Sequence, residues 1–219
     1  MQNSFYYCER NSLHFLAEPL NFFTNLLFLA FSILLIKNKK INNKSLPIIL
    51  FGIGVGSMLF HSIPNNLTAF IDIFFIILFI FFFLIQLYYK LKVNIYLSYI
   101  LSALFILLCY IFGNYFKHSI LKESAFYFPI LLHLYFLIIF FFIFKQKRVY
   151  LKSFILIPIL FSISLYLRTI DFRYCNTFPL GTHFFWHIIN SIVLFLTVNF
   201  IHSIPNRASP KKPSQTQKK

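Results

Sequence analysis

The stretch LTAFIDIFFIILFIFFFLIQLYY, residues 67–89, is apolar along almost its whole length and contains a single charged residue, Asp72. An α-helix needs about 20 mostly apolar residues to cross the hydrocarbon core of a bilayer, so this stretch predicts a membrane-spanning helix. The composition extends the prediction to the whole chain, because 59% of the 219 residues are hydrophobic and only 11% are charged. A water-soluble domain of this size could not bury so much apolar surface, and we therefore predict an all-α integral membrane protein.

Six further apolar stretches are long enough to cross a bilayer, which gives seven predicted spans. No linker or repeat separates them, so residues 1–204 are predicted to form one seven-span domain. Residues 205–219, rich in Pro, Ser, Lys and Gln, are predicted to be a disordered basic tail. The predicted spans are Pro19–Ile36, Leu46–Phe60 (running on to about Ile63), Leu67–Tyr89, Ile95–Phe112, Ala125–Phe144, Val149–Leu167 and Leu180–Ile204.

Basic residues are distributed unevenly between the two ends of these spans. The loops after spans one, three and five, together with the tail, contain 15 of the 20 Lys and Arg residues. The positive-inside rule then places the N-terminus outside and the C-terminus in the cytoplasm. The net charge of +15 is explained by these loops, so no nucleic-acid partner is predicted. The short loops and the absence of a targeting or secretory pattern favour a bacterial inner membrane, with the first span retained.

With this topology, all five acidic residues and three histidines fall at or near the non-cytoplasmic side. His183 and His187 are four residues apart at the start of the last span, so they share one helical face. Ser57 and His61 have the same spacing at the end of the second span, and Asp72 follows 11 residues after His61. Ionisable side chains within spans are costly and often functional, so we predict a site where spans two, three and seven meet.

Three neutral imidazoles suffice for a catalytic zinc that keeps a fourth position for water. Zinc lowers the pKa of that water to about 7 and so supplies a nucleophile at ordinary pH. Asp72 could orient a histidine or transfer a proton, and the Ser57 hydroxyl could donate to a developing oxyanion. The alternative remains open at this point, because paired histidines at a membrane surface can simply be hydrated, and serine or histidine can hydrogen-bond between spans.

The motif Gly56-Ser57-x-x-x-His61, then Asp72, then His183-x-x-x-His187, resembles the alkaline ceramidase family of seven-span hydrolases. That family belongs to a superfamily that includes progestin/adipoQ-type receptors and GPI-lipid remodelling enzymes. The N-terminal Cys8-Glu9-Arg10-Asn11, followed by Ala17-Glu18 and Asn21-x-x-x-Asn25, resembles the ceramidase branch in particular.

The resemblance implies zinc bound by His61, His183 and His187, with Ser57 and Asp72 as catalytic partners. It also implies hydrolysis of ceramide or another N-acyl lipid taken from the bilayer, which releases a fatty acid and a long-chain base. A receptor or lipid sensor with a structural zinc is the alternative, and a proton-coupled transporter is a weaker one.

The same resemblance implies a calcium site in the N-terminal segment, with Glu9, Asn11 and Glu18 as oxygen ligands and Tyr7 contributing a backbone carbonyl. Tyr6 departs from the family pattern, which has an aspartate there, and the loss of one carboxylate should weaken calcium binding. The alternative is that Glu9 and Glu18 form salt bridges or cap the first span.

Three further interpretations concern packing. Gly52 and Gly56 form a Gly-x-x-x-Gly pair that would let the second span approach a neighbour closely. Cys8 and Cys175 both fall outside, where either a disulfide or two free thiols is compatible with the sequence. Asp171, between Arg168 and Arg173, is interpreted as part of a loop ion pair.

Overall fold

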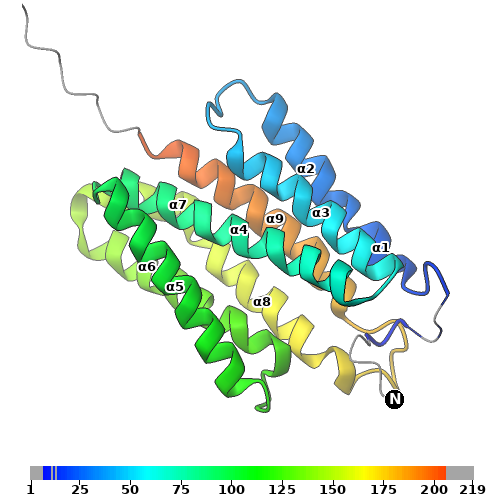
Figure 1. The fold of residues 1–219 in the computed structure, drawn as a ribbon. Helices are drawn as coiled ribbons and strands as arrows, with labels where there is room; N and C mark the ends of the chain where they lie inside the picture. The colour runs from blue at the N-terminus through cyan, green and yellow to red at the C-terminus, as the bar shows by residue number, and fades with distance from the viewer. Residues whose placement is uncertain (1–6, 11, 13, 206–219) are drawn as a thin grey trace, which may run out of the picture.

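The structure is a computed structural model that describes residues 7–10, 12 and 14–205. These residues contain helices and turns but no β-strand, and seven helical segments are long and apolar enough to cross a membrane. Figure 1 shows the helices side by side as one bundle. The α-helices are α1 (Pro19–Thr24), α2 (Leu26–Lys37), α3 (Ser45–Ser62), α4 (Asn66–Lys90), α5 (Ile95–Phe116), α6 (Phe128–Ile143), α7 (Leu151–Phe154), α8 (Leu156–Ile170) and α9 (His183–Ser203), and the 3-10 helices are η1 (Lys122–Tyr127), η2 (Lys145–Tyr150) and η3 (Asp171–Arg173).

The prediction of seven spans in an all-α protein is confirmed. Most boundaries agree within a few residues, but the sixth span runs over Arg148–Arg173 and so continues well beyond the predicted end at Leu167. The helix continues past Arg168 because that guanidinium lies over the rings of Tyr127 and Trp186, where its charge does not force the chain into water. Residues 206–219 of the predicted disordered tail, and Asn11, lie outside the described residues.

The last span, α9, lies inside the bundle. It packs against α1, α2, α3, α4 and α8, and α3 and α9 are the two spans with the largest buried share. Spans two, three and seven are therefore neighbours, as the predicted site requires. The N-terminal segment and the loop between α8 and α9 lie at one end of the bundle, and the end of α9 lies at the other (Figure 1).

Glycine brings α3 and α4 together at the level of the candidate site. A Cβ on Gly56 would lie 3.2 Å from the Cα of Asp72 and 3.2 Å from the carbonyl oxygen of Ile71. Either contact is tighter than a side chain normally allows, and the backbone atoms involved cannot move aside cheaply. The close approach predicted for the Gly52–Gly56 pair is thus observed, and it sets Ser57 beside Asp72.

The structure gives Asp171 a different role from the predicted ion pair. Its carboxylate accepts hydrogen bonds from the backbone N–H groups of Thr182 (2.6 Å) and His183 (2.9 Å), and from that of Cys8 (3.2 Å). These donors include the first backbone amides of α9, which have no partner within the helix. Gly181 adopts a left-handed φ of +65°, and a Cβ there would overlap the Asp171 carboxylate. Asp171 therefore caps α9 from a distance, and only glycine fits beside it.

Cys8 and Cys175 form a disulfide, with their Cα atoms 5.0 Å apart. The sequence was compatible with either a disulfide or two free thiols, and the structure contains the disulfide. The bond joins the N-terminal segment to the loop before α9 across 167 residues of sequence. Both segments contribute to the candidate site, so the disulfide connects two of its parts covalently.

We expect reduction of this disulfide to destabilise the outer end of the bundle. Loss of a native disulfide typically costs about 2–5 kcal/mol, which corresponds to a fall in Tm of roughly 5–15 °C for a domain of this size. Thermal unfolding of the detergent-purified protein, with and without reductant, measures this. The double variant C8S/C175S should start at the lower Tm and show no further change with reductant. An unchanged wild-type Tm after thiol titration has confirmed reduction would contradict the expectation.

Candidate active site

Three histidines converge at the outer end of the bundle. His61 lies in the last turn of α3, and His183 and His187 lie in the first turns of α9. Their ring nitrogens lie within 4.8 Å of one another, and the side chains are buried, with exposures of 1–3%. The helical spacing predicted that His183 and His187 share a face, and the packing of α9 against α3 brings His61 to them.

This group of histidines fits a metal ion. A tetrahedral zinc has Zn–N bonds of about 2.0–2.1 Å, so its ligand nitrogens must lie close together, as one nitrogen from each of these rings does. The Nδ1 atom of His183 is buried and has no hydrogen-bond partner among the described residues, as expected of a position awaiting a ligand. Three imidazole donors also suit zinc and similar transition metals rather than a hard cation such as magnesium.

Hydrogen bonds orient two of the rings. The Nδ1 of His61 lies 2.5 Å from a carboxylate oxygen of Glu18, and the Nδ1 of His187 lies 3.1 Å from the Thr24 hydroxyl. Because Thr24 donates its own proton to the carbonyl of Leu20 (2.7 Å), it accepts from His187. Both Nδ1 atoms therefore carry the proton, which leaves each Nε2 free as a ligand. Thr24 was not predicted as a site residue, because no spacing or motif in the sequence provides a signal for it.

His183 is held by stacking instead. Its ring lies parallel to that of Tyr7, with centroids 3.7 Å apart and an angle of 21° between the planes. Its backbone N–H is bound to Asp171. Ring stacking and a capped helix start thus fix His183 without using its Nδ1 atom.

Ser57 and Asp72 lie on the cavity side of the histidines. The Ser57 hydroxyl is within hydrogen-bonding reach of the Asp72 carboxylate. Asp72 also interacts electrostatically with His61 and Arg168. Both Ser57 and Asp72 line the cavity described below. The structure therefore brings together all five residues for which the sequence predicted zinc binding or catalysis: Ser57, His61, Asp72, His183 and His187.

The two N-terminal carboxylates make other contacts. Glu9 accepts from the backbone N–H groups of Leu20 (2.6 Å) and Asn21 (2.9 Å), and so caps α1. Glu18 forms a buried ion pair with Arg10, contacts His61, and accepts from the side chain of Asn21 (3.0 Å). The salt bridges and helix cap that we left open as an alternative are thus present.

The protonation of these carboxylates follows from the same contacts. Burial raises the pKa of Glu9 above its usual value, although its backbone hydrogen bonds act in the opposite direction. Burial would also raise the pKa of Glu18, but the hydrogen bond and charge of His61 and the charge of Arg10 outweigh it, so the pKa is lowered. Glu18 is therefore an anion that accepts from the His61 ring.

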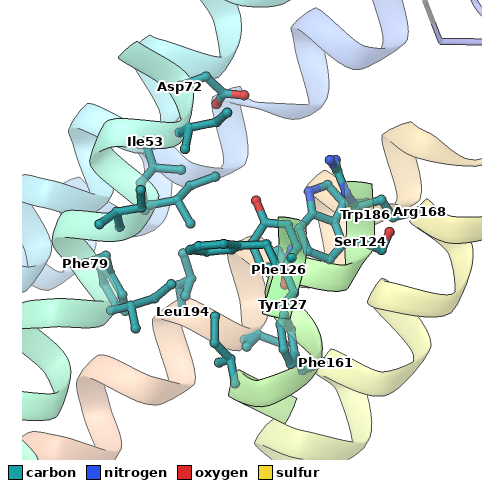
Figure 2. A pocket seen from close by; sticks show the side chains of 18 of the residues that line it. Ile53, Asp72, Phe79, Ser124, Phe126, Tyr127, Phe161, Arg168, Trp186 and Leu194 are labelled. Carbon is teal, nitrogen blue, oxygen red and sulfur yellow. The ribbon is translucent and has the colours of Figure 1, made fainter. Parts of the chain in front are cut away.

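A cavity of about 720 Å³ begins at the histidines and continues into the apolar interior. Its lining runs along α9 from His183 and His187 to Thr197, which places its inner end about 15 Å below His187 at 1.5 Å per residue. Figure 2 shows Ile53, Phe79, Phe161 and Leu194 among its walls. A long, mostly apolar cavity with histidines at one end suits a lipid whose reacting group lies near its head.

Arg168 also lines the cavity, and it was not among the site residues predicted from the sequence. Its guanidinium lies 5.2 Å from the ring centre of Trp186 and 5.5 Å from that of Tyr127, and it donates to the Tyr7 hydroxyl at 3.4 Å. Figure 2 shows Arg168 and Trp186 across the cavity from Asp72. Trp186 is 6% exposed, so it packs inside the protein rather than in an aromatic belt. The available signal was a cation directly after the predicted end of the sixth span, on the same side of the membrane as His183.

The fold and site define a multi-pass membrane protein with a candidate metal centre at the head of a lipid-sized cavity. A family model described as Ceramidase matches residues 2–218, nearly the whole chain, and the protein belongs to that family. Ceramidases are metal-dependent hydrolases that act on the amide bond of ceramide, a lipid substrate. Neither the curated proteins nor the solved structures contain a match to this chain.

We expect the purified protein to retain one metal ion per chain. Replacing His61, His183 or His187 by alanine should reduce the metal content to a small fraction of the wild-type value, because two imidazoles bind far more weakly than three. Elemental analysis by mass spectrometry after gel filtration measures this. His14→Ala, a change at an exposed histidine, is the control. Full retention of metal by H183A and H187A would contradict the assignment.

Proposed function

We propose that this protein is a zinc-dependent ceramidase-like amide hydrolase, embedded in the membrane, with its site facing the non-cytoplasmic side. The observation that supports this best is that Ser57 and Asp72 line the same apolar cavity as the buried His183 and His187. The substrate class is ceramide or another N-acyl lipid, and the products are a fatty acid and a long-chain base.

The donor set favours zinc. His61, His183 and His187 would hold it, as borderline-soft nitrogen ligands in a buried site. When bound, zinc would act as a Lewis acid toward water and the amide carbonyl. Glu18 and Thr24 keep the His61 and His187 rings oriented for this purpose, while Tyr7 does the same for His183 by stacking.

The protein's own groups supply the remaining steps. The Asp72 carboxylate accepts the proton of the attacking water and returns it to the leaving amine nitrogen, so that the amine departs neutral. The Ser57 hydroxyl, beside Asp72, donates a hydrogen bond to the oxygen on which negative charge develops. The apolar cavity excludes bulk water from the acyl chain and aligns the amide with these groups.

The proposed orientation rests on two independent observations. Most basic residues lie at the opposite end from the site. The site end also carries the Cys8–Cys175 disulfide, a bond that persists in oxidising compartments outside the cytoplasm. A bacterial inner membrane, with the site on its periplasmic side, satisfies both.

The direct test is to incubate the purified protein with a panel of N-acyl lipids and to measure the fatty acid released. A zinc chelator should abolish release, and added zinc should restore it. Absence of release from every lipid in the panel, by protein with a full metal complement, would contradict the proposed function.

Ser57→Ala and Asp72→Asn should separate chemistry from metal binding. We expect both variants to retain wild-type metal content. Their kcat should fall about 10²–10³-fold for S57A, through loss of an oxyanion donor, and about 10²–10⁴-fold for D72N, through loss of proton transfer. Metal analysis and turnover are measured on the same preparation. Turnover close to wild type in D72N would exclude Asp72 as the proton carrier.

Thr197→Trp should shorten the cavity from its inner end. We expect the variant to keep its activity on short-chain substrates and to lose at least about tenfold in kcat/KM on long-chain ones, because a filled pocket excludes the terminal methylenes. The matched control is Ile163→Trp, which adds the same side chain on an exposed face of α8. The same loss across all chain lengths in T197W would show that the acyl chain does not reach this residue.

A further inference from the structure

Arg10 is a buried cation in the N-terminal segment. It is 5% exposed, and its Nε donates to Glu18 in an ion pair in which both side chains are almost fully buried. A second nitrogen of the same guanidinium donates to the backbone carbonyl of His61 at 2.9 Å. One side chain therefore connects the N-terminal segment to the carboxylate that orients His61 and to the backbone of His61 itself.

The acceptors around Arg10 are of the kind that a calcium ion uses. Calcium takes six to eight oxygen ligands, mainly carboxylates and backbone carbonyls. Here a carboxylate oxygen of Glu18 and the carbonyl of His61 converge on the guanidinium instead. A cation in the same place would face the positive charge of Arg10, so the described residues do not fit the calcium site that the family resemblance implied.

Glu9, a second expected calcium ligand, is also engaged. Both carboxylate oxygens of Glu9 accept backbone N–H groups at the start of α1. A carboxylate that caps a helix satisfies amides that have no partner within the helix, and that contribution would be lost if Glu9 turned toward a metal ion. Glu9 and Glu18 thus support α1 and His61 through N–H donors.

We infer that Arg10 is a built-in cation that takes the place of calcium beside the histidine centre, so that the protein needs no calcium to hold Glu18 and His61. A buried carboxylate requires a positive partner, and an arginine supplies charge and directed hydrogen bonds together. Arg10 is a positioning residue, because it acts on the centre through Glu18 and the His61 backbone. The zinc-affinity measurement below rests on the metal site of the proposed function, but the stability measurements do not.

The first measurement is the Tm of the detergent-purified protein in millimolar calcium and in a calcium-selective chelator. We expect the two values to agree within error in the wild type, because no ligand binds the folded state. A calcium-dependent rise of several degrees in the wild type would overturn the inference.

The second measurement uses variants of the ion pair. Arg10→Gln should lower Tm by about 10 °C, because it leaves the Glu18 charge buried without its arginine partner. The double variant R10Q/E18Q should recover part of that loss, since both charges are gone. The control is Arg173→Gln, at an exposed arginine in the same region, which should leave Tm unchanged. Additive losses in the double variant would show that Arg10 does not act through Glu18.

The third measurement distinguishes positioning from general stability. In R10Q at a temperature where it remains folded, the affinity for zinc should fall about 10–100-fold, as it does when groups that orient metal ligands are removed. Arg10→Lys, which keeps the charge but not the two-pronged geometry, should fall between R10Q and the wild type. Unchanged zinc affinity in a folded R10Q would overturn the positioning role, whatever the fate of the hydrolase assay.

Discussion

The outer end of this protein depends on the hydrogen bonds that the Asp171 carboxylate accepts. Three backbone N–H groups from two distant segments meet it, and two of them begin α9. Without that anion, the first turn of α9 would expose unpaired amides inside a crowded end of the bundle. Because His183 and His187 lie in the first two turns, the position of the helix start determines where two of the three proposed ligands point. Gly181 leaves room for these hydrogen bonds, since no larger residue fits beside Asp171.

A second constraint acts from the other side of the site. The absence of a side chain on Gly56 lets the α4 backbone lie against α3 at Asp72. Ser57 follows Gly56 directly, and His61 lies one turn later, so the same contact determines the depth of both relative to α4. The Asp171 cap and Gly56 act independently. Asp171 positions the last span, and Gly56 lets the second span pack against the third. The centre forms where these two pairings meet.

Hydropathy and charge were enough to predict the seven spans and the shared depth of Ser57, His61, Asp72, His183 and His187. Apolar length and helical spacing are properties of short segments, so they can be read locally. The contacts of Thr24, Arg168 and Asp171 could not be predicted in this way. Each depends on residues more than ten positions away, and no local pattern separates a capping aspartate from one in an ion pair. The end of the sixth span was missed for the same reason, because aromatic rings from other segments shelter Arg168.

The charged residues around the three histidines fall into two groups, and the division has a chemical consequence. The first group belongs to the N-terminal segment: Arg10 pairs with Glu18, and Glu9 caps α1. Asp72 and Arg168 face the cavity. An anionic Glu18 hydrogen-bonded to His61 raises the electron density of that ring and so strengthens it as a ligand. Asp72, by contrast, lines the cavity and has the Ser57 hydroxyl as a hydrogen-bond partner. Under the proposed function, the neighbours of these two carboxylates suit them to different tasks: Glu18 would support a metal ligand, and Asp72 would exchange a proton with a lipid amide.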